Sequence, residues 1–141
     1  MNDEQEIRAL IAGHFEALKW GGGEEPDWPR FREDFHPQAV LIGAARPATV
    51  RSVEGFIERM DTVARKNLET FEEHTSGMKI LRFGNVAVVL ASSDLLENGS
   101  DRSVDLSGYL LVKSEGRWSI AAHAWDQVGQ EFKRPDDWIE P

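Results

Sequence analysis

The fold is decided by the stretch Asn85–Trp125, which reads NVAVVLASSDLLENGSDRSVDLSGYLLVKSEGRWSIAAHAW. It contains three apolar runs: Asn85–Leu96, Val104–Lys113 and Arg117–Trp125. The first two are separated by a turn containing Asn98-Gly99, a dipeptide that accepts the positive φ angles of a tight hairpin. The last two are separated by a turn in which Gly116 can adopt the left-handed conformation. The stretch therefore predicts a meander of three antiparallel strands.

The residues before this meander predict helices that cover one of its faces. Asn2 or Asp3 can cap a first helix, and a single apolar stripe follows at helical spacing: Ile7, Leu10, Ile11, His14, Phe15 and Leu18. Asp27 can cap a short second helix and Ser52 a third. The inward side chains of the third helix are Phe56, Ile57, Met60, Val63 and Ala64.

Two further extended segments are expected outside the meander. A short buried strand is predicted at Ala39–Gly43, followed by a loop at Ala44–Val50. An extended segment is predicted at Leu68–Phe83, with Gly77 marking a bulge or a bend. Helices followed by an antiparallel meander indicate an α+β fold. The length of 141 residues fits one domain, residues 1–141, with its core at about 6–127 and a C-terminal tail at 128–141.

Composition excludes several classes of partner and site. The net charge of −9 argues against binding to nucleic acid or to anionic membranes. There are no cysteines, and the four histidines have no paired ligand spacing, so no metal and no cofactor is expected. The N-terminus is acidic and lacks the apolar region of a signal peptide, and no apolar run is long enough to span a bilayer. A cytoplasmic location is therefore expected.

Both faces of the predicted meander are apolar, so the face away from the helices also needs a cover. Strict alternation assigns to this outer face Trp118, Ile120, Ala122 and Ala124, together with Tyr109 and Leu111. Such a patch predicts a homodimer formed through the outer face of the sheet. The alternative is that the C-terminal tail folds back and covers this face with Trp138 and Ile139.

The order of these motifs resembles the NTF2-like superfamily, with its SnoaL-like and lumazine-binding-like branches nearest. The resemblance covers roughly Glu6–Gln127, and its specific parts are Phe35–Leu41, Asn85–Val89 and Gly116–Trp125. It implies a curved sheet wrapped around three N-terminal helices, with a pocket at the open end of the cone. Members include steroid isomerase-like enzymes, polyketide cyclases, hydratases and many proteins without known activity, so the fold alone does not give the reaction.

The resemblance also points to candidate site residues. His14 is similar in position to a Tyr that donates to an oxyanion in steroid isomerase-like members, and Trp125 is similar to an aromatic of the pocket wall. The predicted ligand-binding residues are His14, Phe56, Met60, Leu110, His123 and Trp125. The two acids of the isomerase-like branch correspond to Gly43 and Gly108, so that mechanism is not expected here.

Three hypotheses of function follow. The first is a protein that binds a small apolar or cyclic molecule in the cone pocket, with or without catalysis. The second is a non-catalytic homodimerisation module. The third is a cyclase-like or isomerase-like enzyme that uses His14 or Asp94 as its acid or base. For His14, a buried ring satisfied by a backbone carbonyl or water is an equally good interpretation. Asp105 and Glu73 are further acids whose facing the sequence does not decide.

Overall fold

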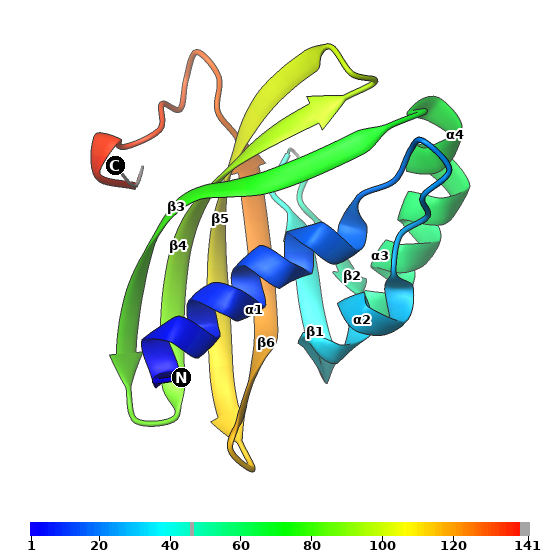
Figure 1. Ribbon diagram of the computed structural model, residues 1–141. Coiled ribbons are helices and arrows are strands. Elements are labelled where there is room, and N and C mark those ends of the chain that lie inside the picture. The colour runs from blue at the N-terminus through cyan, green and yellow to red at the C-terminus, as the bar shows by residue number, and fades with distance from the viewer. Residues whose placement is uncertain (46, 139–141) are drawn as a thin grey trace.

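The computed structural model describes residues 1–45 and 47–138. Its helical segments are α1 (Asp3–Leu18), α2 (Trp28–Glu33), α3 (Val53–Arg59), the π-helix η1 (Met60–Ala64), α4 (Arg65–Asn67) and the 3-10 helix η2 (Asp136–Trp138). Its strands are β1 (Phe35–Gly43), β2 (Thr49–Ser52), β3 (Phe71–Phe83), β4 (Val86–Glu97), β5 (Asp101–Ser114) and β6 (Arg117–Gln127). They form one curved sheet in the order β2-β1-β6-β5-β4-β3, and the α+β prediction is confirmed (Figure 1).

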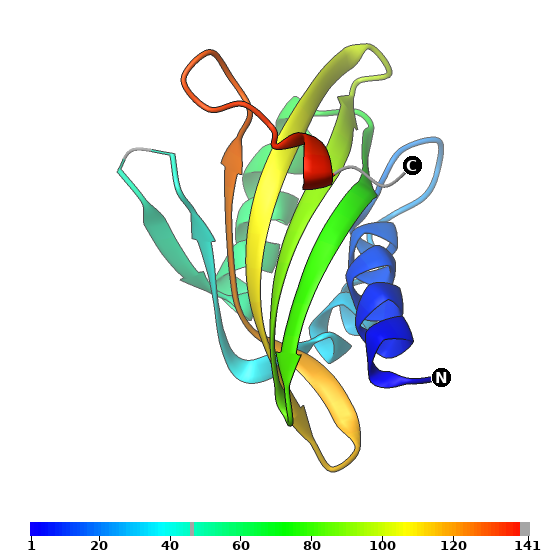
Figure 2. The same cartoon turned by 90° about the vertical axis from the view of Figure 1, so that its left-hand side faces the viewer.

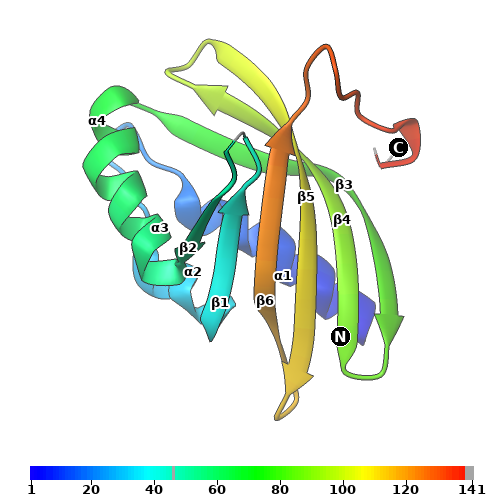
Figure 3. The same cartoon turned by 180° about the vertical axis from the view of Figure 1, so that it is seen from behind.

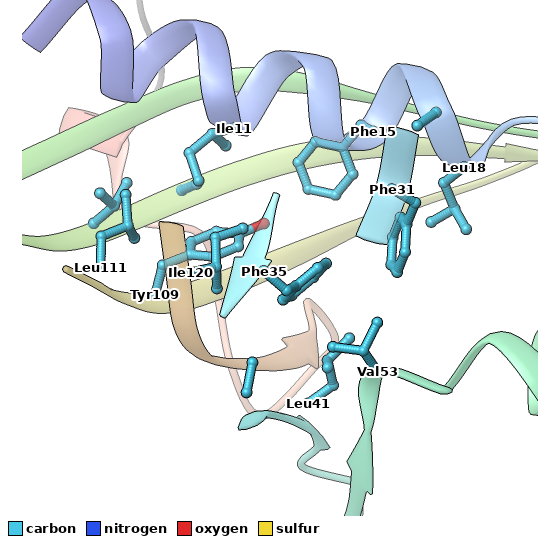
Figure 4. Packing of buried hydrophobic residues seen from close by; sticks show 14 of the residues in the cluster. Ile11, Phe15, Leu18, Phe31, Phe35, Leu41, Val53, Tyr109, Leu111 and Ile120 are labelled. Carbon is cyan, nitrogen blue, oxygen red and sulfur yellow. The ribbon is translucent and has the colours of Figure 1, made fainter. Parts of the chain in front are cut away.

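Helix α1 lies across the concave face of the sheet because its apolar stripe and its cap agree. The Asn2 side chain accepts a hydrogen bond from the Gln5 backbone N–H, and the Gln5 side chain accepts one from the Asn2 N–H. This reciprocal pair satisfies two backbone donors at the helix start. The stripe then buries Ile11, Phe15 and Leu18 against the sheet (Figure 4). His14 lies on the same buried stripe.

The second and third helices that the sequence predicts, α2 and α3, begin at the expected capping residues. Asp27 caps α2 through the Arg30 backbone N–H, and Ser52 caps α3 through the Gly55 backbone N–H. The chain from α3 continues through η1 into α4. Figure 3 shows this helical segment beside β1 and β2, at the edge of the sheet.

The sheet is mixed, because β1 runs parallel to β6 while all other neighbouring strands are antiparallel. The turn between β4 and β5 has positive φ at both Asn98 and Gly99, as the sequence predicts. The register of β3 against β4 shifts between Thr75 and Gly77, which confirms a bulge there. Strand β2 differs from the sequence prediction. The segment Ala44–Val50 carries no long apolar run and predicts a loop, but its last two residues begin β2.

A second bulge overturns the predicted facing of β6. Leu110 pairs with Ala122 and Leu111 pairs with Ile120, so Ala121 is an extra residue on β6. Alternation is therefore reset at Ala121. Trp118 and Ile120 point inward before the bulge, and His123 points inward after it.

The predicted outer patch is consequently wrong in four of its members. Trp118, Ile120, Tyr109 and Leu111 are all buried in the core. Tyr109 and Leu111 are at most 2% exposed. The predicted alternation along β5 is correct, but the face predicted to point outward is the inner face. Figure 4 shows these two side chains close to Ile120 on the inner side.

A different apolar surface covers the outer face. A row crosses five strands in register: Leu81, Val88, Leu110, Ala122 and Val40. Leu110, Val88 and Val40 are 42%, 41% and 37% exposed. We call these five residues the outer row.

The described part of the C-terminal tail crosses one part of the outer face (Figure 2). Asp137 pairs with Lys79 at 2.5 Å, and Arg134 Nη1 donates to Ser92 Oγ at 3.2 Å and to Asp94 Oδ1 at 3.4 Å. Segment η2 contacts β3 and β4. Ile139, expected to help cover the sheet, lies outside the described residues.

Candidate ligand-binding site

A cavity of about 170 Å³ lies between the concave face of the sheet and the helices. We call it the inner cavity. Helices α1, α3 and η1 and strands β1, β3, β4, β5 and β6 all contribute to its wall. Its lining residues are His14, Phe15, Leu18, Leu41, Phe56, Met60, Phe71, Glu73, Leu95, Asp105, Ser107, His123 and Trp125. Most of this wall is apolar, and its polar groups are two imidazoles, two carboxyls and one hydroxyl.

His14 enters the inner cavity from α1 and has no hydrogen bond with any described residue. Its exposed fraction is 2%, and its Nδ1 is a buried nitrogen without a partner. The ring contacts those of Phe15, Phe31 and Phe35, with centroid separations of 4.9, 4.9 and 5.3 Å. Burial, followed by the nearby Arg30 guanidinium, lowers the pKa of His14 to about 3. His14 is therefore a neutral imidazole at pH 7.

His123 faces His14 across the inner cavity, with their ring centroids 5.6 Å apart and their planes nearly perpendicular. Its Nε2 lies 3.0 Å from Ser107 Oγ, and its ring stacks on Tyr109 at 4.1 Å. On the other side Trp125 lies 4.8 Å away. Burial and the neighbouring His14 hold the pKa of His123 well below its usual value. Both imidazoles are thus neutral, and His123 is fixed in orientation by its neighbours.

Two carboxyl groups line the same cavity from β3 and β5, the strands on either side of β4. Glu73 on β3 is 7% exposed, and its Oε2 accepts a hydrogen bond from Ser93 Oγ at 2.6 Å. Burial, opposed by the Ser93 hydrogen bond and reinforced by the charge of Asp105, raises the pKa of Glu73 to about 8. Burial also raises the pKa of Asp105, to about 6, with Asp126 and Glu97 adding to the effect. At pH 7 Glu73 is largely protonated and Asp105 largely ionised, so the inner cavity holds a proton donor and a base.

The predicted site residues fall into two groups. His14, Phe56, Met60, His123 and Trp125 all line the inner cavity. Leu110 does not, because it belongs to the outer row on the opposite face of β5.

Asp94 also lies away from the inner cavity. It is an exposed residue of β4 and forms an ion pair with Arg134 at 3.4 Å. It is therefore not a base for a molecule bound in the inner cavity. Asp105 and Glu73, whose facing the sequence does not decide, both line the inner cavity.

The facing of Glu73 was open in the sequence, although one signal pointed to it. Phe71 and Glu73 are two residues apart and share a face of β3, and Phe71 is an apolar residue of the core. An acid at the inward position of a strand is unusual, because burial of an unpaired carboxylate is costly. Asp105 follows the same logic on β5, where it shares a face with Ser107 and Tyr109.

Among residues 1–45 and 47–138, no group of three or more His, Asp or Glu side chains is arranged to hold a metal ion. In the same residues, every helix is too short or too polar to cross a bilayer.

Comparison with known proteins identifies the fold through similar solved structures. No protein-family model and no curated protein matches this sequence. Solved structures do match. One is an NTF2-like protein with a cystatin-like fold from Novosphingobium aromaticivorans, with a TM-score of 0.75 and 13% identity over 91% of this chain and 83% of that one. The chain has the NTF2-like fold.

Two further structures extend this likeness to proteins whose names carry an activity. One is the hexachlorocyclohexane dehydrochlorinase LinA-type3 from Novosphingobium barchaimii LL02, with a TM-score of 0.71 and 10% identity over 94% of both chains. The other is a ketosteroid isomerase-like protein from Erwinia carotovora atroseptica SCRI1043, with a TM-score of 0.63 and 18% identity over 89% of this chain and 93% of that one. At such identities the likeness covers the NTF2-like fold and not the chemistry.

Proposed function

We propose that this protein binds a small, mainly apolar ring compound in the inner cavity, with a polar atom of the compound near His14. The observation that carries the proposal is the pairing of an apolar cavity with a buried imidazole that lacks a hydrogen bond. A buried polar group without a partner costs about 1–3 kcal/mol. A ligand that supplies a hydrogen bond to His14 would offset that cost.

The dimensions of the inner cavity suit a single ring. Its volume is about 170 Å³, and an apolar cavity of about 150 Å³ is known to bind benzene. Phe56 and Trp125 are in edge-to-face contact at 5.9 Å and form one apolar wall. The protonated Glu73 carboxyl and the neutral imidazoles offer hydrogen bonds to a carbonyl or hydroxyl group.

Acetophenone, a ring with one carbonyl group, is a suitable first probe. Binding is measured by isothermal calorimetry and by quenching of tryptophan fluorescence. Leu95→Trp fills the inner cavity and is expected to weaken binding by about tenfold or more, equivalent to about 1.4 kcal/mol. The matched control is Leu96→Trp, since Leu96 is the next residue of β4 and does not line the cavity. Equal affinity in both variants, or no binding to the wild type, would refute the proposal.

A second candidate function is proton transfer to or from the bound compound. It is favoured by Glu73 and Asp105, which line one cavity with pKa values of about 8 and about 6. Asp105 could remove a proton next to a carbonyl group while Glu73 donates to its oxygen. The steroid isomerase arrangement is not proposed, because glycines stand at positions 43 and 108. Exchange of the methyl protons of acetophenone in D₂O, followed by NMR, tests this candidate.

We also propose a homodimer formed through the outer face of the sheet. The support is the outer row, which runs across five strands and keeps Leu110, Val88 and Val40 more than one-third exposed. Extended apolar patches on a surface are typical of interfaces between proteins. A cone with its cavity on the concave side leaves the outer face available for such an interface.

A further inference from the structure

A second hollow adjoins the inner cavity and differs from it in charge. It has a volume of about 350 Å³ and lies between the β1–β2 hairpin and α3. We call it the outer hollow. It shares four wall residues with the inner cavity: Leu41, Phe56, Met60 and Trp125. The outer hollow is therefore adjacent to a ring that occupies the inner cavity.

Among the described residues that line the outer hollow, the charged side chains are those of Arg51 and Arg59. Arg51 pairs in register with Leu41, a core residue that is 1% exposed, so Arg51 lies on the inner face of the edge strand β2. An arginine is seldom placed toward the core side of a sheet without a carboxylate partner. Neither Arg51 nor Arg59 forms an ion pair or a side-chain hydrogen bond with a described residue.

Two acids close in sequence to these arginines, Glu54 and Asp61, bind elsewhere. Glu54 accepts from Arg32 at 2.6 and 3.1 Å. Asp61 accepts from Arg65 at 2.9 Å and from the Trp28 indole at 3.0 Å. The two guanidinium groups are thus left available in a chain whose net charge is −9.

The floor of the outer hollow leaves room for an anionic group. Gly43 contributes no side chain, and a Cβ built there would lie 3.6 Å from Cζ2 of Trp125. The described lining contains no Asp or Glu, whereas the inner cavity holds two acids. The ionised Asp105 carboxylate therefore repels an anion at the inner end, and the two arginines attract it at the outer end. Guanidinium groups bind carboxylates through paired, charge-assisted hydrogen bonds.

We infer that the ligand is a ring compound that carries a carboxylate, with its ring in the inner cavity and its carboxylate beside Arg51 and Arg59. This inference rests on the proposed function and names the class of compound that the cavity takes. It also sets the orientation of the ligand, with its neutral polar atom toward His14 and its charged end toward β2.

A matched pair of probes tests the inference: 3-phenylpropionate, which is an anion at pH 7, and its neutral amide, 3-phenylpropionamide. Wild-type protein is expected to bind the carboxylate about tenfold more tightly than the amide. Arg51→Gln should remove this preference, and Arg59→Gln, an exposed position where folding is less at risk, should reduce it. Arg102→Gln, which removes the same charge from an exposed position on β5, should leave the preference unchanged.

Acetophenone separates the two proposals. Arg51→Gln should bind it as the wild type does, because Arg51 does not line the inner cavity. If acetophenone binds but the carboxylate has no advantage over the amide, the inference is wrong and the proposed function stands. An equal loss of preference in Arg102→Gln also overturns the inference, because it would indicate a general charge effect. If none of the three probes binds, both proposals fail.

Discussion

At the scale of single residues, the inner cavity is distinguished by polar groups held in their neutral forms. His14 is surrounded by the aromatic rings of Phe15, Phe31 and Phe35, so a positive charge on it would be poorly solvated. Its pKa of about 3 means that folding favours the neutral ring. Its contribution to stability is therefore present above pH 6.5 and is lost as the pH falls toward 3. The contribution of Glu73 to stability depends on pH in the opposite direction, because burial raises its pKa.

The raised pKa of Glu73 predicts a testable dependence of the free energy of unfolding on pH. Its pKa rises from 4.5 to about 8 in the folded protein. Between these values the folded state retains a proton that the unfolded state has released, so this group stabilises the fold most at low pH. Its contribution then falls by up to about 1.4 kcal/mol per pH unit as the pH rises from 4.5 to 8. Glu73→Gln should lack this fall, so its stability relative to the wild type should improve with rising pH.

Urea unfolding at a series of pH values between 4.5 and 8 measures this difference. Comparison of each variant with the wild type cancels the titration of Asp34, whose pKa is also raised, to about 6. The matched control is Glu72→Gln, which makes the same change at the exposed neighbouring position. A difference between Glu73→Gln and wild type that stays constant over this range would show that Glu73 ionises at an ordinary pH in the folded protein.

At the scale of elements, β6 illustrates what the sequence can and cannot predict. Strand positions, turns and helix caps follow from local chemistry, and the turn at Asn98-Gly99 and the cap at Ser52 were predicted correctly. The bulge at Ala121 was not predicted, because the small side chains of Ala121 and Ala122 do not show which residue of the strand is extra. One undetected bulge reverses the facing of every residue beyond it.

Apolar side chains on both faces were the second limit on prediction. Strand β5 alternates Leu110 with Tyr109 and Leu111, so either face could have been the inner one. The structure places Tyr109 and Leu111 in the core and Leu110 outside. By contrast, the histidine of the α1 stripe could be assigned to the interior, because a helix with one apolar face leaves no such choice.

The bulge predicts a large effect from a single deletion. Removal of Ala121 would restore simple alternation, so either Trp118 and Ile120 or His123 and Trp125 would be forced onto the outer face. Each large apolar side chain moved into water costs about 1.5–3 kcal/mol. We therefore expect a loss of roughly 3–6 kcal/mol in the free energy of unfolding, much of the stability of a domain of this size.

Thermal and urea unfolding followed by circular dichroism check this expectation. The control is deletion of Gln130, an exposed residue beyond the end of β6. This deletion should change stability little. A chain without Ala121 that unfolds at the temperature of the wild type would mean that β6 tolerates either register, and that the bulge does not determine the position of His123.

At the scale of the whole molecule, the two faces of the sheet have separate roles. The concave face holds the helices (Figures 1 and 3). The inner cavity and the outer hollow lie on the same side of the sheet. The outer face carries the outer row, and the described part of the tail contacts this face near Ser92 and Lys79. Ligand binding and association between two copies can thus be altered independently by substitution on one face or the other.

The dimer is tested by placing a charge at the centre of the outer row. Leu110 is 42% exposed and lies between Val88 and Ala122 in the register of the sheet. Leu110→Glu should fold normally as a monomer, because the side chain is outside the core, whereas a dimer would bury the new charge without a partner. A stable dimer buries about 800 Å² on each partner, so loss of its central contact should lower affinity strongly.

Sedimentation at micromolar concentration gives the oligomeric state. Phe132→Glu is the matched control, since Phe132 is 49% exposed but belongs to the tail and not to the outer row. Wild type, this control and a chain truncated after Gln130 should all sediment as dimers. A wild type that is monomeric, together with a truncated chain that associates, would reverse the conclusion. It would mean that the tail held by Arg134 and Asp137 covers the sheet within one chain, and that the outer row faces solvent.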